Sequence, residues 1–396
     1  MRQYERNLYV LCFAIFLASV SWCQVMPFLP LFLKEMGVKR YLIQWSGYVF
    51  AAQSLASIVA VPFWSRLGDR HGRKPMTLRA GICLAGIYFG MSVCQTPMQL
   101  AILRFLNGAL TGFIPGAIAL IATGTPQDRA PRAVATAQTA SATGQIVGPG
   151  IGGLLAGIFG YRGAMTVSGT AVVISVLLVW LFVRETGKVA ADDGSSLLDD
   201  FVLAFRSPVL SSLMLVVMVN GFVMASLVPL LALHLGKIGS GAPDWFTGFI
   251  FSLPAAAFVL SAHRWSLFGE RRGYHRAITT GFAGGALFVA VLAGVHSIWL
   301  FAALYFALGL CVAAVAPSTG AVICTRVPDE FRGRAYGMQS SAVMLGGLVA
   351  PVTATQLAAH LGIPSVFIGA GLLYLAGLAL FRTLVPRWEH VPDRAG

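Results

Sequence analysis

The stretch Gly144–Gly153, GQIVGPGIGG, decides the class of this protein. It lies inside a segment, 133–159, that carries no charge and is long enough to cross a bilayer. Five glycines and a proline would destabilise a helix in water, but in lipid small residues four apart let another helix backbone approach closely. Because Pro149 lacks an amide hydrogen, we expect the helix to bend or pivot there. The predicted hinge residues are Gly144, Gly148, Pro149 and Gly152.

The composition is typical of a polytopic membrane protein. Of 396 residues, 57% are hydrophobic and 11% are charged, and the mean hydropathy is +0.76, far from the usage of soluble domains. Apolar stretches of about 20 residues, the length that crosses the hydrocarbon layer, recur along the chain. We place twelve predicted spans at 7–33, 42–65, 76–94, 100–123, 133–159, 163–183, 209–235, 246–265, 277–293, 297–324, 335–361 and 364–384.

The basic residues predict the orientation in the membrane. If both termini are inside, the inward segments hold 21 of the 28 Lys and Arg residues and the outward loops hold five. Since cytoplasmic loops carry an excess of Lys and Arg, we expect a multi-pass membrane protein with both termini in the cytoplasm. The same bias accounts for the net charge of +13 without a nucleic-acid partner. The six cysteines lie in or at the edges of spans, and we interpret them as packing residues.

One long polar segment, 184–208, divides the predicted spans six to six. The two halves share a pattern in which six residues recur at a constant offset of 201. Trp64, Ser65, Gly68, Asp69, Arg70 and Gly72 are matched by Trp265, Ser266, Gly269, Glu270, Arg271 and Gly273. Parallel six-helix repeats are a known transporter architecture. We therefore predict two six-helix bundles, 1–184 and 209–396, joined by a cytoplasmic linker, 185–208.

Two motifs resemble signatures of the major facilitator superfamily. The run Gly144–Gly153 is similar to the helix 5 motif of its antiporters. The segment Ser65–Lys74, SRLGDRHGRK, is similar to its signature between helices 2 and 3, with Ser65 and Gly68 in place of the expected Gly and Ala. The resemblance implies an all-α membrane protein of the major facilitator fold, with twelve transmembrane helices in two six-helix pseudo-repeats. It also implies a substrate site near the membrane midplane between the halves.

The signature segment also implies a gate. By resemblance, the Asp69 carboxylate is a latch that pairs with Arg70 or Arg73 and accepts hydrogen bonds from the amino end of a neighbouring helix, contacts that break when the halves rock. The alternative is a solvated loop whose charges serve only topology. The residues assigned to gating are Asp69, Arg70, Gly72, Arg73 and, in the second half, Glu270.

Arg104 is the other exceptional residue. It lies several residues into the fourth span, in LAILRFLNG, and with Gly108 resembles the superfamily's helix 4 motif, although Ala101 departs from it. An intramembrane arginine costs several kcal/mol unless it faces the bundle interior. The resemblance implies a role in proton coupling; the alternative is a side chain that snorkels to the surface.

No predicted span carries a carboxylate near its centre. Many cation exporters of the superfamily bury such a group, so this chain departs from their pattern. The candidates for substrate contact are polar and aromatic residues of the spans that line the two-half interface in this fold. They are Trp22, Gln24, Phe28, Gln53, Asn107, Gln138, Asn220, Tyr305 and Gln339, with Gln145 as a further amide. Each amide could instead bond a neighbouring helix.

The resemblance as a whole is to the small bacterial multidrug efflux branch of the twelve-span drug:proton antiporters. It implies export of amphipathic drugs or toxic small molecules driven by protons, from a chain that acts as a monomer in the lipid bilayer. Export of one endogenous anionic or zwitterionic metabolite, such as a siderophore, and an uptake or non-transporting role stay open. The sequence has no P-loop, nucleophile constellation or metal-ligand spacing, so we expect no enzyme activity, cofactor or metal.

Overall fold

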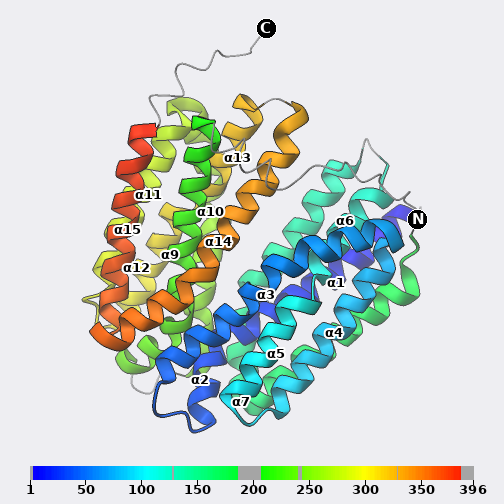
Figure 1. The fold of residues 1–396 in the computed structure, drawn as a ribbon, viewed down its shortest axis with the longest axis horizontal. Coiled ribbons are helices and arrows are strands. Elements are labelled where there is room, and N and C mark those ends of the chain that lie inside the picture. Colours follow the sequence, from blue (N-terminus) through cyan, green and yellow to red (C-terminus); the bar gives the residue numbers. More distant parts are fainter. Residues whose placement is uncertain (1–2, 127–128, 186–206, 240–242, 328, 385–396) are drawn as a thin grey trace. The chain divides into compact units, whose positions relative to one another are not determined.

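The computed structural model describes residues 3–126, 129–185, 207–239, 243–327 and 329–384, and its regular structure within these ranges is helical (Figure 1). The first half contains α1 (Gln3–Val25), η1 (Met26–Phe28), α2 (Leu29–Glu35), α3 (Leu42–His71), α4 (Arg73–Val93), α5 (Pro97–Leu110), α6 (Phe113–Gly124) and α7 (Ala130–Phe182). The second contains α9 (Pro208–Ile238), α10 (Asp244–Arg272), α11 (Tyr274–Leu292), α12 (Ile298–Val312), α13 (Val315–Arg326), α14 (Asp329–Leu361) and α15 (Ile363–Leu384).

The helices fall on the twelve predicted spans. Ten described segments are long and apolar enough to cross a membrane. One of them, Arg132–Phe182, is 51 residues long and has the length for two crossings. Gly160, with φ 70° and ψ 173°, interrupts the helix between the two predicted spans. The remaining predicted span, 42–65, is covered by α3.

The chain forms two compact units. Unit 1 consists of Met1–Asp193 with Gly241–Ser252, and unit 2 of Gly194–Ser240 with Leu253–Gly396. The predicted linker, 185–208, lies almost entirely outside the described residues, so the predicted domain boundaries stay a prediction.

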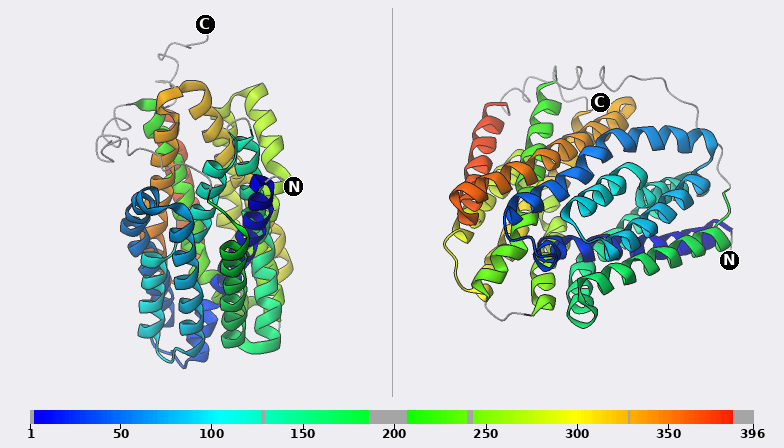
Figure 2. Two further views of the ribbon diagram at one scale, coloured as in Figure 1. Left: turned by 90° about the vertical axis from the view of Figure 1, so that its right-hand side faces the viewer. Right: turned by 60° about the horizontal axis from the view of Figure 1, so that its bottom comes forward.

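Glycines decide how the helices of unit 1 pack. α1 runs alongside α7, and α3 alongside α5 (Figures 1 and 2). A Cβ atom placed on Gly148 would lie 2.9 Å from the Val20 carbonyl oxygen, and one on Gly152 would lie 2.3 Å from that of Gln24. The predicted stripe of small residues on α7 is thus the surface that contacts α1. This is expected in lipid, where helices associate through close van der Waals packing because no hydrophobic effect drives them together. Pro149 keeps helical backbone angles, and Gly160 is the residue of α7 that departs from them.

Unit 2 repeats the first of these contacts. α14 runs alongside α9, and α11 alongside α15 and α12. A Cβ on Gly346 of α14 would lie 2.4 Å from the Met218 carbonyl oxygen of α9. Ala350, which corresponds to Gly148, lies one turn after Gly346 on α14 and is fully buried.

A pair of tryptophans shows the duplication in hydrogen bonds. The Trp64 indole N–H donates to the Ala109 carbonyl oxygen at 2.6 Å, and the Trp265 indole N–H donates to that of Leu310 at 2.7 Å. The two tryptophans are 201 positions apart, and so are the two acceptor residues, which is the offset seen in the sequence. Both acceptors lie near a break in the fourth helix of their repeat, between α5 and α6 and between α12 and α13.

The gap between the predicted spans 42–65 and 76–94 implies a loop at 66–75, but the structure is helical there except at Gly72. α3 continues to His71 and α4 begins at Arg73, so Gly72 alone makes the turn, with φ 98° and ψ 141°. The turn of unit 2 is equally short, with Gly273 at φ 94° and ψ 135°. Glycine takes this backbone conformation without the steric cost of a Cβ, so one residue suffices and the expected loop was wrong.

The packing predicts unequal tolerance of substitutions within the glycine run. Gly148→Ala should push α1 and α7 apart and cost about 1–3 kcal/mol, the usual range for overpacking. Gly150→Ala is the matched control, because a Cβ at Gly150 has no atom within 4 Å. Gly148→Ala should unfold at a lower temperature in detergent and transport less than Gly150→Ala. Equal behaviour of well-expressed variants would contradict a special role for the Gly148 contact.

Candidate functional site

The candidate site of unit 1 starts from the way α5 is held. A capping box starts α5, in which the Gln99 amide donates to Thr96 Oγ1 at 3.2 Å and the Thr96 amide donates to Gln99 Oε1 at 3.1 Å. The helix ends at Leu110, and Gly112, with φ 136°, turns the chain into α6. Arg104 therefore lies about two turns into a short, well-defined helix.

Gly108 brings α3 against α5. A Cβ at this position would lie 2.0 Å from the Gln53 carbonyl oxygen, so a glycine is required for the contact. The close approach encloses two of the predicted substrate residues, since Gln53 is 6% exposed and Asn107 is fully buried. Asn107 and Arg104 lie on the same face of α5 because they are three residues apart.

Arg104 is enclosed by apolar and aromatic side chains. It is 2% exposed, so it does not snorkel to the surface. Its Nη2 lies 3.3 Å from the Met26 sulfur, and its guanidinium carbon is 6.0 Å from the Trp22 ring centre and 5.7 Å from that of Phe50. The buried Tyr88 lies near it. No described carboxylate pairs with it.

Three polar groups of this cluster are buried without a hydrogen-bond partner among the described residues. They are Arg104 Nε, Asn107 Nδ2 and Gln53 Oε1. A buried unpaired polar atom costs roughly 1–3 kcal/mol, so an arrangement of two donors and one acceptor suits a bound polar molecule or water. We call Arg104, Asn107 and Gln53 the polar cluster.

The other predicted substrate residues of unit 1 have different surroundings. Trp22 faces Arg104, whereas Gln24 donates to the Ala164 carbonyl oxygen at 3.3 Å and to Ser168, and so ties α1 to α7. Phe28 is buried and stacks on Tyr161 at 6.0 Å. The side chains of Gln138 and Gln145 are exposed. The structure therefore places Trp22 beside Arg104 and encloses Gln53 and Asn107 at the contact of α3 with α5, and it gives the others different surroundings.

Unit 2 holds a separate set of polar contacts. Asn220 Oδ1 accepts from the Tyr374 hydroxyl at 2.9 Å, and Gln339 Nε2 donates to Thr319 Oγ1 at 2.8 Å. Tyr305 is buried and stacks on Phe301. His234 is 6% exposed and lies against Phe301 and Phe367, and its Nε2 has no partner among the described residues.

The predicted gate residues lie at the turn between α3 and α4. The side chains of Asp69 and Arg70 are outside the described part of the structure, so the latch stays a prediction. Arg73 donates from Nη1 to the Ala119 carbonyl oxygen of α6 at 3.0 Å. In unit 2, Glu270 is exposed and accepts from the Ser266 hydroxyl at 3.5 Å.

A carboxylate that we had assigned to the linker caps this turn. Glu185 Oε1 accepts from the Arg73 backbone amide at 2.7 Å, and Oε2 accepts from that of Lys74 at 3.2 Å. These amides are at the start of α4, where the unpaired N–H groups and the helix dipole favour an anion. Lys74 Nζ in turn donates to the carbonyl oxygen of Val183, two positions before Glu185, at 2.6 Å.

Sequence reasoning missed Met26, Phe50 and Tyr88 beside Arg104, and Glu185 at the turn. No motif marks them. The apolar residues look like ordinary packing residues, and Glu185 lies in a polar segment more than 100 positions from the amides that it binds.

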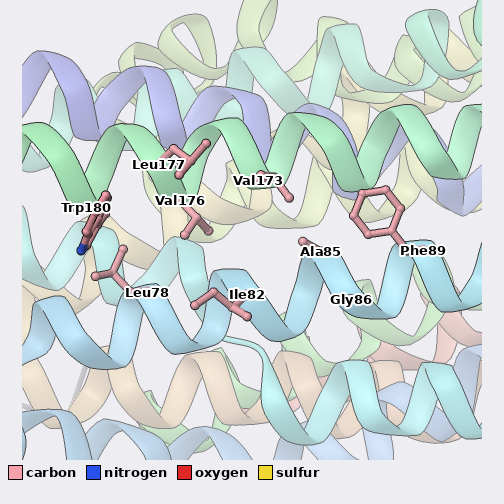
Figure 3. Close-up of a pocket in the computed structure, with 9 residues that line it drawn as sticks. All are labelled: Leu78, Ile82, Ala85, Gly86, Phe89, Val173, Val176, Leu177 and Trp180. Carbon is pink, nitrogen blue, oxygen red and sulfur yellow. The ribbon is translucent and has the colours of Figure 1, made fainter.

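An apolar groove of about 460 Å³ lies between α4 and the second part of α7 (Figure 3). None of the predicted substrate residues lines it. Ile82, Leu177 and Trp180 in its wall are largely exposed, and exposed apolar side chains on a membrane-spanning helix face lipid. We therefore do not assign this groove to the substrate.

Comparisons with known proteins agree with the predicted fold. The family model of the Major Facilitator Superfamily matches residues 11–262 and 213–395. Multidrug resistance protein MdtG of Salmonella arizonae is 31% identical over 99% of this chain and 96% of its own length, and that of Proteus mirabilis is 30% identical over 97% and 96%. Among solved structures, a bacterial homologue of the lysosomal transporter Spinster has a TM-score of 0.82 at 13% identity, with 98% of each chain covered. The nucleoside transporter NupG has a TM-score of 0.80 at 13% identity, covering 97% of this chain and 100% of that one.

The contacts of Glu185 predict that it stabilises unit 1. Glu185→Gln keeps the shape but removes the charge at the start of α4, and should lower the free energy of unfolding by about 0.3–1 kcal/mol. Glu35→Gln, at the C-terminal end of α2, is the control for loss of an exposed carboxylate. Thermal unfolding of the purified protein at low ionic strength measures the difference, which should shrink in high salt. Identical curves for both variants would argue against the cap.

Proposed function

Since the chain belongs to the Major Facilitator Superfamily and is a multi-pass membrane transporter rather than an enzyme, we propose that it is a proton-coupled exporter of amphipathic drugs or toxic small molecules. It works by alternating access as a monomer in the bacterial inner membrane, with both termini in the cytoplasm. The relatives named as multidrug resistance proteins, similar over nearly their whole length, support the direction and class of transport.

The burial of Arg104 without a carboxylate is the observation that carries the proposal. Burying a positive charge is costly unless another charge or several acceptors compensate it. Among described groups, Arg104 has only the Met26 sulfur, the faces of Trp22 and Phe50 and the nearby Tyr88. An uncompensated arginine beside unpaired amide groups makes this part of unit 1 electropositive and able to pair with a negative group of a ligand.

The substrates should therefore be neutral, zwitterionic or anionic amphiphiles rather than dications. Aromatic rings beside the polar cluster supply apolar contact for such molecules, and the cluster supplies a few directional hydrogen bonds. Gln53, with an unpaired acceptor, and Asn107, with an unpaired donor, suit ligands of varied polarity.

The second candidate function is export of one endogenous anionic or zwitterionic metabolite. The same uncompensated Arg104 favours it, because a buried guanidinium recognises a carboxylate or phosphate with high specificity. A multidrug exporter should protect cells against several unrelated amphiphiles, whereas a dedicated exporter should change the cellular level of one metabolite. Drug and metabolite accumulation in a deletion strain, with and without a protonophore, separates the two.

Within this proposal the glycine run of α7 serves as a pivot and the Asp69 region as a gate. The contacts of Gly148 and Gly152 with α1 support a rigid pair in which small shifts pass from one helix to the other. The single-residue turn at Gly72 supports a gate. Because it joins α3 directly to α4, a movement of one helix is passed to the other.

Transport in everted vesicles tests the coupling. If substrate enters the lumen in exchange for protons, adding it should raise the internal pH of acidified vesicles, reported by a pH-sensitive dye. The rise should vanish when a protonophore collapses the gradient, and vesicles from cells without the protein are the control. Uptake that continues unchanged after the gradient is collapsed would contradict antiport.

Neutralising Arg104 tests the electrostatic argument. Arg104→Gln should weaken transport of anionic substrates at least tenfold, as about 1.4 kcal/mol of lost pairing would, and neutral substrates less. Equal loss for all substrates would assign Arg104 to proton coupling alone. Arg79→Gln is a control, because Arg79 stacks on Trp64 at 3.4 Å, away from the polar cluster. Strong resistance to quaternary ammonium dications in the wild type would contradict the proposed selectivity.

A further inference from the structure

The two repeats carry differently charged groups at the start of their third helix, which is α4 in the first repeat and α11 in the second. Gly72 and Gly273 make the same turn, with φ of 98° and 94°. A Cβ on Gly72 would lie 3.1 Å from Glu185 Oε2, whereas one on Gly273 would lie 2.9 Å from Cε1 of the His275 imidazole. The first repeat therefore has a carboxylate at this helix start, and among the described residues the second has an imidazole in its place.

A cavity of about 490 Å³ opens beside this second turn. It lies among the end of α10, the start of α11 and the end of α15, and is lined by Phe268, Arg272, His275, Arg276, Thr279, Thr280 and Arg382. The guanidinium of Arg272 lies 5.5 Å from the Phe268 ring centre. Among the described residues, Arg272, Arg276 and Arg382 have no hydrogen bond or ion pair through their side chains. We call this cavity the basic pocket.

Three unpaired guanidinium groups in one pocket repel one another unless an anion lies between them. The amino end of α11 adds a partial positive charge. No carboxylate lines the pocket within the described part of the chain. An arginine cluster of this kind suits a phosphate, which accepts several charge-assisted hydrogen bonds at once.

The membrane position favours a phosphate that belongs to a lipid. The positive-inside distribution predicts that this end of unit 2 faces the cytoplasm, so the pocket lies at the level of the inner-leaflet headgroups. Leu287 lies two turns above Thr280 on α11, and Leu375 two turns above Arg382 on α15, and both are at least half exposed. Residues seven apart share a helix face, so an apolar surface for acyl chains continues from the pocket into the hydrocarbon layer.

We propose that the basic pocket binds the phosphate of an anionic phospholipid of the inner leaflet. The phosphate lies among Arg272, Arg276 and Arg382 at the start of α11, and supplies the negative charge that Glu185 supplies at the start of α4. Basic pockets between transmembrane helices on the cytoplasmic side are recognised sites of anionic headgroups. The site is independent of the polar cluster and of the transported substrate.

Lipid titration of the full-length protein tests this proposal. Delipidated protein in a neutral detergent is titrated with phosphatidylglycerol, phosphatidylcholine or sodium phosphate. Bound lipid is counted by native mass spectrometry and stability is followed by thermal unfolding. Phosphatidylglycerol should bind and stabilise more than phosphatidylcholine. The double variant Arg276→Gln/Arg382→Gln should bind it about 30-fold more weakly, from the usual contribution of two basic residues at a membrane surface.

The control is Arg271→Gln, which removes an exposed charge next to the pocket that does not line it. Retained phosphatidylglycerol affinity in this control, with loss in the double variant, supports the proposal. Equal loss in both would mean general surface charge and overturn it. Stabilisation by sodium phosphate alone at similar concentration would assign the pocket to a soluble anion instead. A Glu389→Gln/Asp393→Asn variant that binds phosphatidylglycerol more tightly than the wild type would show that the chain's own carboxylates compete for the pocket, and would also contradict the proposal.

Discussion

Close contact between helix backbones is the constraint on which the rest of this structure depends. In lipid, apolar side chains gain little by leaving hydrocarbon for protein, so helices associate through close packing and a few polar contacts. Gly108, Gly148 and Gly152 each lie where a Cβ would collide with the carbonyl group of another helix. The positions of these glycines therefore determine which helices pair and how closely.

The polar cluster follows from one of these contacts. Because Gly108 lets α3 touch α5, Gln53 and Asn107 are enclosed and Arg104 is screened from the surface. A larger residue at 108 would separate the helices and admit lipid or water, and the arginine could then be solvated. The same packing that stabilises unit 1 thus creates its unpaired charge, on which the proposed pairing with a ligand depends.

The duplication explains both the similarity and the difference of the two units. The paired indole bonds of Trp64 and Trp265 and the turns at Gly72 and Gly273 are retained, because each repeat must solve the same packing problem at the same place. The charges around these turns are not under that constraint. Glu185 compensates the start of α4, whereas the start of α11 faces a pocket of arginines. At these two turns, among the described residues, it is therefore the second repeat that has positive charge to offset.

The sequence by itself determined the membrane-spanning segments, the duplication, the class of protein and the presence of an arginine inside a span. These follow from hydropathy, from the offset of 201 and from residues whose cost in lipid is high wherever they lie. The sequence could not distinguish the amides that have unpaired atoms, Gln53 and Asn107, from Gln24, whose amide hydrogen-bonds to α7. All three are amide side chains in apolar spans. Nor could it find Glu185 beneath α4 or unite Arg276 with Arg382. Only tertiary structure decided these, because contacts between residues more than 100 positions apart depend on how the helices pack and not on any local pattern.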